Sequence, residues 1–377
     1  MIIDISDSSF RKVLNDKELY LPIRWNGSDF NVTLDKLFSH YIKQIELLPD
    51  ENSSFDNRVR VNVKDIKRIC GLLLKAVNHY HNGFPAKAYS SFERAMNLLM
   101  ETPLKIYQKN VLEQFELPSD RYRVDDGLKL FRVVSVEDNK PYSRIRVFHT
   151  PYNLRSKVST SRYSIAGYPS LYLGTTVALC CEEINMNPHK NFALVSMFKL
   201  ERTFEYTNTN IRVIELGVKP QDFLDIDYYN ESHDRRIAPD LLKDRSTRSA
   251  YLLWYPLIAS CSYIRTNKND PFAAEYVIPQ LLMQWVRNEI GSNTGDEYAQ
   301  LVGIRYFSCA SVKASDMGFN YVFPTSGQQK SGELPYCAVL SKAFRLTNPV
   351  YLHEYDDLRT CEWKLRSSSD FDFIDSI

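Results

Sequence analysis

The feature that most constrains the fold is a change of hydrophobic pattern near residue 127 of this 377-residue chain. Before it, apolar residues recur every three or four positions over 64–81 and again over 86–100, which predicts two helices. Asn82-Gly83 and Pro85 separate them with a tight turn. We therefore predict an antiparallel helical hairpin within an N-terminal helical region.

After residue 127 the pattern becomes that of short strands. The expected strands cover 128–136, 144–149, 171–173, 193–200, 211–216 and 301–308, with one helix over 276–287. This order predicts the α+β class, with a mixed or antiparallel β-sheet core. The expected divisions are a helical region over 1–125, a β-rich domain over 126–360 and a polar tail over 361–377, with an exposed loop at 50–57.

Composition excludes several classes of protein. The net charge is +1 and the basic residues are mixed with acidic ones, so nucleic acid is not an expected partner. Seven cysteines without a CxxC pair predict neither a disulfide framework nor a metal site. No apolar run is long enough for a membrane span, and the N-terminus lacks the pattern of a secretory signal, so a cytoplasmic location is expected.

The common phosphate-binding loops are also missing. Neither GxGxxG nor GxxxxGK[ST] occurs, and the chain has only 13 glycines. Any bound nucleotide must therefore be held by side chains.

The segment over 162–183, RYSIAGYPSLYLGTTVALCCEE, combines the residue types of a binding site. It reads as a short strand followed by a helix with Thr175 or Thr176 as N-cap. Glu182 and Glu183 lie at the end of that helix. Because neighbouring helical residues point about 100° apart, only one of these acids can face the strand.

Six separated motifs in a fixed order carry a family resemblance. They are LFRVVS, FHTPYNLR, RYSIAGYPSLYLG, CCEEI, EYVIPQLLMQWV and GIRYFS. Together they resemble the RES-domain family over about residues 125–325. The resemblance implies an ADP-ribosyltransferase-like fold, NAD+ as the substrate with no further cofactor, and cleavage of the nicotinamide-ribose bond by hydrolysis or phosphorolysis. Some members of that family are toxins paired with a separate antitoxin.

Seven residues are candidates for this site. The resemblance assigns positions to Arg132, Tyr172, Glu183 and Ser308, the chemistry of the substrate adds Arg162 and Tyr163, and His149 lies in a matching motif. Arg132, Glu183 and Ser308 occupy the catalytic positions, and the substrate-binding positions are Arg162, Tyr163, Tyr172 and His149. Spacing from the strand tyrosine favours Glu183 over Glu182.

These residue types suit the chemistry independently of the family. A carboxylate stabilises the positive charge that develops on the ribose, and a guanidinium binds phosphate through paired hydrogen bonds. Tyrosine rings hold the flat, cationic nicotinamide.

Each residue also has a plainer interpretation. Arg132 could be a surface ion-pair donor, Tyr172 a core aromatic, and Ser308 a residue that ends a strand. His149 matches a segment expected to shape the entrance of the cleft.

The sequence is compatible with three functions. The first is an NAD+-degrading enzyme acting as a toxin or anti-phage defence effector. The second is an ADP-ribosyltransferase that modifies a protein or nucleic acid, and the third is a non-catalytic interaction module. The resemblance implies an antitoxin or regulatory protein as partner, and the helical region is a place for that contact or for contact with a second copy. The family's small toxin members lack such a region.

Overall fold

The computed structural model describes residues 6–49, 61–102, 104, 129–186, 192–200, 212–224, 244–267, 270–292, 302–325 and 335–352, together with 365, 372 and 374. The chain forms two compact units. Unit 1 comprises Met1–Gln108 and Val218–Leu282, and unit 2 comprises Lys109–Gly217 and Met283–Ile377. The expected loop at 50–57 and most of the expected tail at 361–377 lie outside the described residues.

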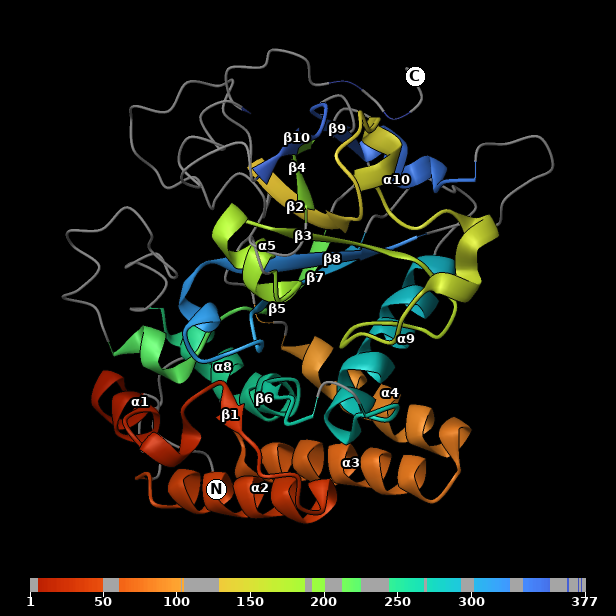
Figure 1. Ribbon diagram of the computed structural model, residues 1–377. Helices are drawn as coiled ribbons and strands as arrows, with labels where there is room; N and C mark the ends of the chain where they lie inside the picture. Colours follow the sequence, from red (N-terminus) through yellow and green to blue (C-terminus); the bar gives the residue numbers. More distant parts are fainter. Residues whose placement is uncertain are drawn as a thin grey trace. The chain divides into compact units, whose positions relative to one another are not determined.

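Unit 1 is mainly helical (Figure 1). Its helices are α1 (Asp7–Leu14), η1 (Lys17–Leu19), α2 (Phe30–Glu46), α3 (Val63–His81), α4 (Pro85–Glu101), η4 (Pro220–Phe223), α8 (Arg245–Ser260) and η6 (Ala274–Tyr276). The short strands β1 (Ile23–Arg24) and β6 (Tyr263–Ile264) pair in parallel. Helix α9 (Val277–Ser292) begins in unit 1, and the division between the units falls within it.

The predicted hairpin is confirmed as α3 and α4. Asn62 caps α3 by accepting a hydrogen bond from the Lys64 N–H at 3.0 Å. Gly83 follows α3 with a φ of 77°, a left-handed conformation that glycine adopts without strain, and Pro85 starts α4. Local sequence therefore accounts for both ends of this turn.

Helix α8 explains why residues 218–282 belong to unit 1. Fourteen of its 16 residues are buried, and a helix that is apolar on all sides must be surrounded by other elements. The hydroxyl of Tyr41 donates to Leu252 O at 2.6 Å, and that of Tyr255 donates to Leu19 O at 3.0 Å. The compact units therefore differ from the division expected at residue 125, because the core of the N-terminal helices is completed by a segment more than a hundred residues later.

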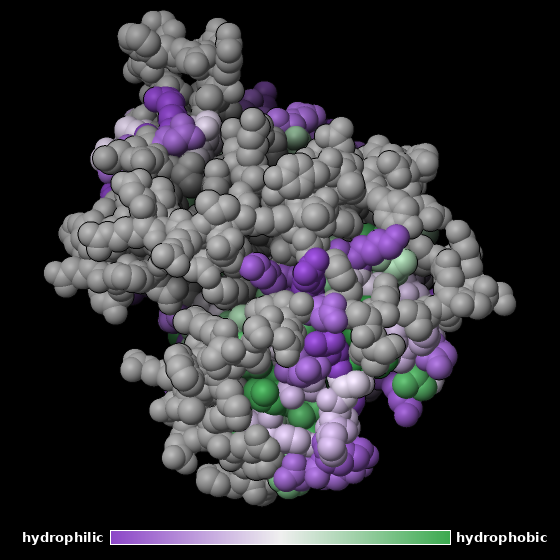
Figure 2. Space-filling model, turned by 90° about the horizontal axis from the view of Figure 1, so that it is seen from above, coloured by the Kyte–Doolittle hydropathy of each residue, from purple (hydrophilic) through white to green (hydrophobic). Residues whose placement is uncertain are grey.

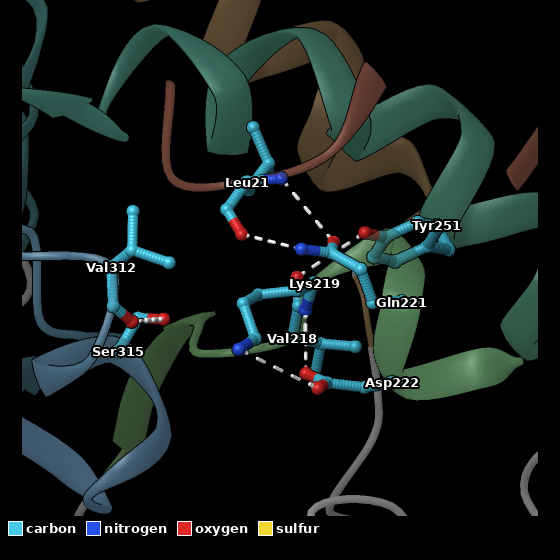
Figure 3. A network of polar contacts seen from close by, with 8 residues as sticks. All are labelled: Leu21, Val218, Lys219, Gln221, Asp222, Tyr251, Val312 and Ser315. Atoms are coloured by element: carbon cyan, nitrogen blue, oxygen red, sulfur yellow. Dashed lines mark hydrogen bonds and ion pairs between the residues drawn. The ribbon is translucent and has the colours of Figure 1, made fainter. Parts of the chain in front are cut away.

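A polar network ties the start of this segment to the N-terminal part of unit 1 (Figure 3). The side chain of Gln221, in η4, donates to Leu21 O at 2.6 Å and accepts from Leu21 N at 3.2 Å. Asp222 accepts from the backbone N–H of Lys219 at 2.8 Å. One glutamine side chain thus satisfies both backbone groups of Leu21, as a neighbouring strand would.

Unit 2 is built on one sheet. Its strands are β2 (Lys129–Val136), β3 (Ser170–Gly174), β4 (Phe192–Leu200), β5 (Arg212–Leu216), β7 (Val302–Phe307), β8 (Phe319–Pro324), β9 (Phe344–Leu346) and β10 (Val350–Tyr351). The order is β10-β4-β2-β3-β8-β7-β5, with β9 also paired to β4. Among the described strands of this sheet, β5 and β7 pair in parallel and the other pairs are antiparallel. The predicted mixed sheet of an α+β protein is confirmed.

Each face of this sheet has its own apolar cluster. Leu130, Leu171, Leu173, Phe198 and Phe323 belong to one cluster, whereas Phe131, Val133, Val195 and Met197 belong to the other. The alternation along β2 follows the two-residue period of a strand. The short helices of unit 2 are η2 (Arg144–Val147), η3 (Tyr152–Lys157), α5 (Val177–Glu183), η7 (Ala314–Asp316) and α10 (Ala338–Ala343).

The strand expected over 144–149 is wrong, because η2 occupies most of this segment. The segment begins with charged and apolar residues in alternation, RIRV. Arg144 is instead buried, at 8% exposure, and its guanidinium lies 3.6 Å from the Asp372 carboxylate. A paired arginine can occupy an interior position, so alternation of charged and apolar residues did not identify a strand here.

Some large apolar side chains of the described residues are exposed. Those that are exposed are Val32, Leu47, Phe84, Met100, Leu154, Ile184, Phe272 and Val312. On the face in Figure 2, the coloured residues are mostly hydrophilic with a few hydrophobic ones between them. Within the described parts of the chain, no helix has the length and apolar character needed to cross a bilayer.

Candidate functional site

Several of the predicted site residues of unit 2 lie around one row of the sheet. Phe131 on β2 pairs with Gly174 on β3, Gly174 with Asn320 on β8, and Asn320 with Tyr306 on β7. Residues paired in this way present their side chains on the same face of a sheet. Tyr172, two residues before Gly174, shares that face.

Helix α5 covers this face of the sheet, with Val177 and Cys180 in the same apolar cluster as Phe131. Thr176 is its N-cap, one of the two predicted residues: its Oγ1 accepts from Leu179 N at 3.1 Å and donates to Met317 O at 2.9 Å. The start of α5 is therefore held to the residues just before β8.

Glu183 is the acid that faces the sheet. It is the last residue of α5, and its Oε1 accepts a hydrogen bond from Nδ2 of Asn320. Asn320 is buried, at 4% exposure, whereas Glu183 is exposed. One carboxylate oxygen is thus attached to the sheet, in agreement with the expectation that only one of the two acids can face it.

Three tyrosines, Tyr163, Tyr172 and Tyr306, lie between Glu183 and the segment 161–163 that precedes β3. The Tyr172 hydroxyl donates to Tyr163 O and lies 2.6 Å from Ser161 Oγ. The Tyr163 ring packs against that of Tyr306, with centroids 4.6 Å apart. Burial raises the pKa of Tyr306 well above its usual value, and the charge of Glu183 and the nearby Tyr172 raise it further, whereas Arg162 lowers it. Arg162, Tyr163, Tyr172 and Glu183 therefore surround one aromatic residue.

The Arg132 side chain reaches this group by extending from β2 toward β3. It follows Phe131, so its side chain starts on the opposite face of β2. Strands β2 and β3 pair through Phe131 and Gly174, and beyond that point the guanidinium donates from Nη1 to Tyr172 O at 2.8 Å. Arg132 replaces a ladder hydrogen bond where the strands part.

The charge of Arg132 is not balanced by a nearby acid in the part of the chain that the structure describes. Its Nε is buried without a hydrogen-bond partner, and no described carboxylate lies within ion-pair distance of its guanidinium. Burial lowers the pKa of Arg132 to about 10, so the side chain remains charged near neutral pH. A half-buried cation with no counter-charge among the described residues is an anion-binding candidate.

Ser308 lies just past β7 and is fully buried. Its Oγ accepts a hydrogen bond from Ala310 N at 3.1 Å. The residue thus shapes the turn after Tyr306.

His149 lies on the opposite face of the sheet, where its ring packs with Phe148 and Tyr152 and the charge of Arg132 reaches it. It is 1% exposed; Nδ1 lies 2.8 Å from Thr150 O, and Nε2 accepts from Cys337 N at 2.9 Å. Both ring nitrogens are used inside the protein, so a role of His149 in binding substrate stays a prediction. In the structure it joins two loops.

The buried imidazole predicts a loss of stability in acid. Burial, and to a smaller extent Arg132, lower the pKa of His149 to about 4 from the usual 6.5, so the folded protein keeps the ring neutral while the unfolded chain binds a proton. Stability from this group should be complete above pH 6.5 and fall by up to roughly 3 kcal/mol as the pH drops to 4. Urea unfolding of wild type and His149→Gln at several pH values should show a steeper loss in the wild type. Equal dependence of stability on pH in the two proteins would contradict this prediction.

Two residues of this group were not singled out from sequence, namely Tyr306 and Asn320. Tyr306 lies within the GIRYFS motif, where only the serine was assigned a role. Asn320 lies in FNYVFP, a strand that is buried throughout. An amide within an otherwise apolar strand is the signal that could have identified it.

A cavity of about 500 Å³ lies in unit 1, and none of the predicted site residues lines it. Its walls include Trp25, Asp29, Tyr80 and Phe272. Among the described residues, no group of three or more His, Cys, Asp or Glu side chains is arranged to hold a metal ion.

Comparison with known proteins provides one relative. The chain is 27% identical over 337 residues to a Bacillus subtilis (strain 168) protein described as "Putative toxin YopC", an alignment that covers 88% of this chain and 68% of that protein. No protein-family model matches the chain, and no solved structure matches it. The chain is therefore similar in sequence to a protein that is described as a toxin.

Proposed function

We propose that the chain is an NAD+-degrading enzyme of the RES type, with an ADP-ribosyltransferase-like fold, that acts as a toxin. The observation that carries this proposal is that one sheet holds both the Arg132 guanidinium, which has no counter-charge among the described residues, and the Glu183 carboxylate. A dinucleotide offers both of the matching groups, since its phosphates are anionic and its nicotinamide ribose becomes cationic during cleavage.

In this proposal Arg132 binds a phosphate oxygen. Its Nη1 already donates to Tyr172 O, which fixes the guanidinium while leaving donors for a ligand. Tyr172, half-buried and fixed through its hydroxyl, offers a ring edge or face to the nicotinamide. Arg162, Tyr163 and Ser308 are more deeply buried and support this surface.

Glu183 acts on the ribose. The bond between C1″ and the nicotinamide nitrogen breaks, and its electron pair neutralises the pyridinium ring. The carboxylate stabilises the cationic sugar that remains. Water then adds to C1″ and releases a proton, giving ADP-ribose, or phosphate adds and gives ADP-ribose 1″-phosphate.

A role as a toxin agrees with the name of the relative and with the consequence of this chemistry. A cell that loses NAD+ cannot sustain its redox reactions, so an enzyme of this kind needs restraint. The resemblance suggests a separate antitoxin as the restraining partner.

Product analysis tests the proposal. Purified full-length protein is incubated with NAD+, with and without inorganic phosphate, and products are separated by chromatography. We expect release of nicotinamide, with free ADP-ribose for hydrolysis or ADP-ribose 1″-phosphate for phosphorolysis. Label transferred from NAD+ to protein or nucleic acid would indicate ADP-ribosyl transfer instead. Intact NAD+ under every condition would favour a non-catalytic interaction module.

A further inference from the structure

We infer that Asn320 is a positioning residue for Glu183, holding one carboxylate oxygen so that the other is directed to the ligand. The inference rests on the proposed function, in which Glu183 acts on the ribose. Its basis is the hydrogen bond from Asn320 Nδ2 to Glu183 Oε1. Because a carboxylate only accepts hydrogen bonds, the amide must present its nitrogen to the glutamate.

The support beneath this hydrogen bond is rigid. Strand β8 is paired on both sides, so the backbone of Asn320 is fixed between Gly174 and Tyr306. The space beside the amide is small: a Cβ on Gly174 would lie 3.5 Å from Asn320 Oδ1 and 2.7 Å from Cys180 Sγ. Glycine at position 174 thus leaves room for the Cys180 thiol of the helix, with the Asn320 amide in ordinary contact beside it.

Helix α5 is attached to the β8 region at both of its ends. Thr176, at its start, bonds to Met317, and Glu183, at its last residue, bonds to Asn320. An exposed glutamate has several rotatable bonds, and a fixed donor selects one of its conformations. Catalysis gains from this selection because the carboxylate need not be reoriented during the reaction.

The chemical nature of an amide also suits the role. A lysine or arginine at position 320 would neutralise the carboxylate, whereas an amide fixes it and leaves its charge for the cationic sugar. Among the described residues, Cys180 and Tyr306 interact electrostatically with Glu183. Cys180 also interacts with Cys181 and Arg132, Tyr306 with Arg162, and Cys181 with Glu182. The thiols and the tyrosine have pKa values raised by burial. None of these three groups titrates between pH 4 and 8.

The substitution Asn320→Asp tests the inference, since it keeps the shape of the side chain, removes the donor and adds a second carboxylate beside Glu183. Two carboxylates that share a site hold a proton more tightly than one. We expect the acidic limb of the kcat profile to move up by about one pH unit or more, with kcat falling more than KM changes. Asn62→Asp, the same exchange at the N-cap of α3, should leave the profile unchanged.

Two further measurements keep the result interpretable. Asn320→Ser, which is too short to reach Glu183 but adds no charge, should lower kcat without moving the acidic limb. Carbon-13 NMR titration, with the Glu183 signal assigned by its loss in Glu183→Gln, should show a raised pKa for the carboxyl pair in Asn320→Asp.

The outcomes separate the two proposals. An unchanged pH profile in an active Asn320→Asp enzyme, or an unchanged Glu183 titration in that variant, would overturn the positioning role while leaving NAD+ cleavage in place. A wild type that releases no nicotinamide would refute the proposed function, and the positioning role in catalysis would fall with it. The NMR titration would then report only whether the two side chains interact.

Discussion

Replacing Glu183 by glutamine is expected to lower the rate of nicotinamide release about 1,000-fold at saturating NAD+. The glutamine oxygen can still accept the hydrogen bond from Asn320, so the end of α5 should keep its place. What disappears is the negative charge that stabilises the cationic ribose. The loss should therefore appear in kcat rather than in KM, and chromatography of nicotinamide over time measures both.

Glu182→Gln is the matched control, because it removes the same charge one residue earlier on the same helix. Adjacent helical residues diverge by about 100°, so Glu182 does not share the orientation of Glu183, and near-normal activity is expected. Induced expression in cells provides a second comparison: the wild type and Glu182→Gln should lower NAD+ and slow growth, whereas Glu183→Gln should do neither. Equal loss of activity in both variants, or full activity in Glu183→Gln, would refute the assignment.

Replacing Glu215 by alanine is expected to destabilise unit 2 by about 3–5 kcal/mol. Glu215 on β5 pairs directly with Arg305 on β7, and their side chains form an ion pair with exposures of 4% and 0%. Glu215 also accepts from the backbone N–H of Gly217, and the guanidinium lies 3.6 Å from the centre of the Phe319 ring. The alanine variant would leave a charged arginine in the interior without this carboxylate. Urea unfolding monitored by circular dichroism measures the change.

The double substitution Glu215→Leu with Arg305→Met distinguishes two contributions to stability. One is the cost of burying a single charge, and the other is the net stabilisation from the ion pair. Removing both charges together avoids leaving a buried arginine without the Glu215 carboxylate, so this variant should be closer to wild type in stability than Glu215→Ala. If the single variant lost less than about 1 kcal/mol, the range of a surface ion pair, then Arg305 would not depend on Glu215 for its charge.

Local sequence determined much of the secondary structure. The apolar period of three to four residues predicted α3 and α4, and turn residues marked their ends. Runs of β-branched and aromatic residues predicted β2, β3, β4, β5 and β7. The geometry of one helix was enough to show that only one acid of the Glu182-Glu183 pair could face the sheet. These features depend on interactions between residues close in sequence, which a pattern can reveal.

Other features depend on which distant segments meet. The apolar residues of α8 do not indicate which elements the helix packs against. In the structure it donates a hydrogen bond to Leu19 and accepts one from Tyr41, which places it in unit 1. The burial of His149 and of Arg144 likewise depends on residues distant in sequence, because His149 bonds to Cys337 and Arg144 pairs with Asp372. Hydrophobic burial is not directional, so a sequence shows that a segment must be covered without showing what covers it.

The candidate site shows the same division. The residue types, their order and the preference for Glu183 over Glu182 came from the sequence alone, because they are properties of short segments. Only the tertiary structure decided that Asn320 reaches that acid and that Arg132 bonds to Tyr172 where β2 and β3 part. The physical reason is strand register: it is set by pairing across the sheet, and a shift of one residue would turn Asn320 to the opposite face.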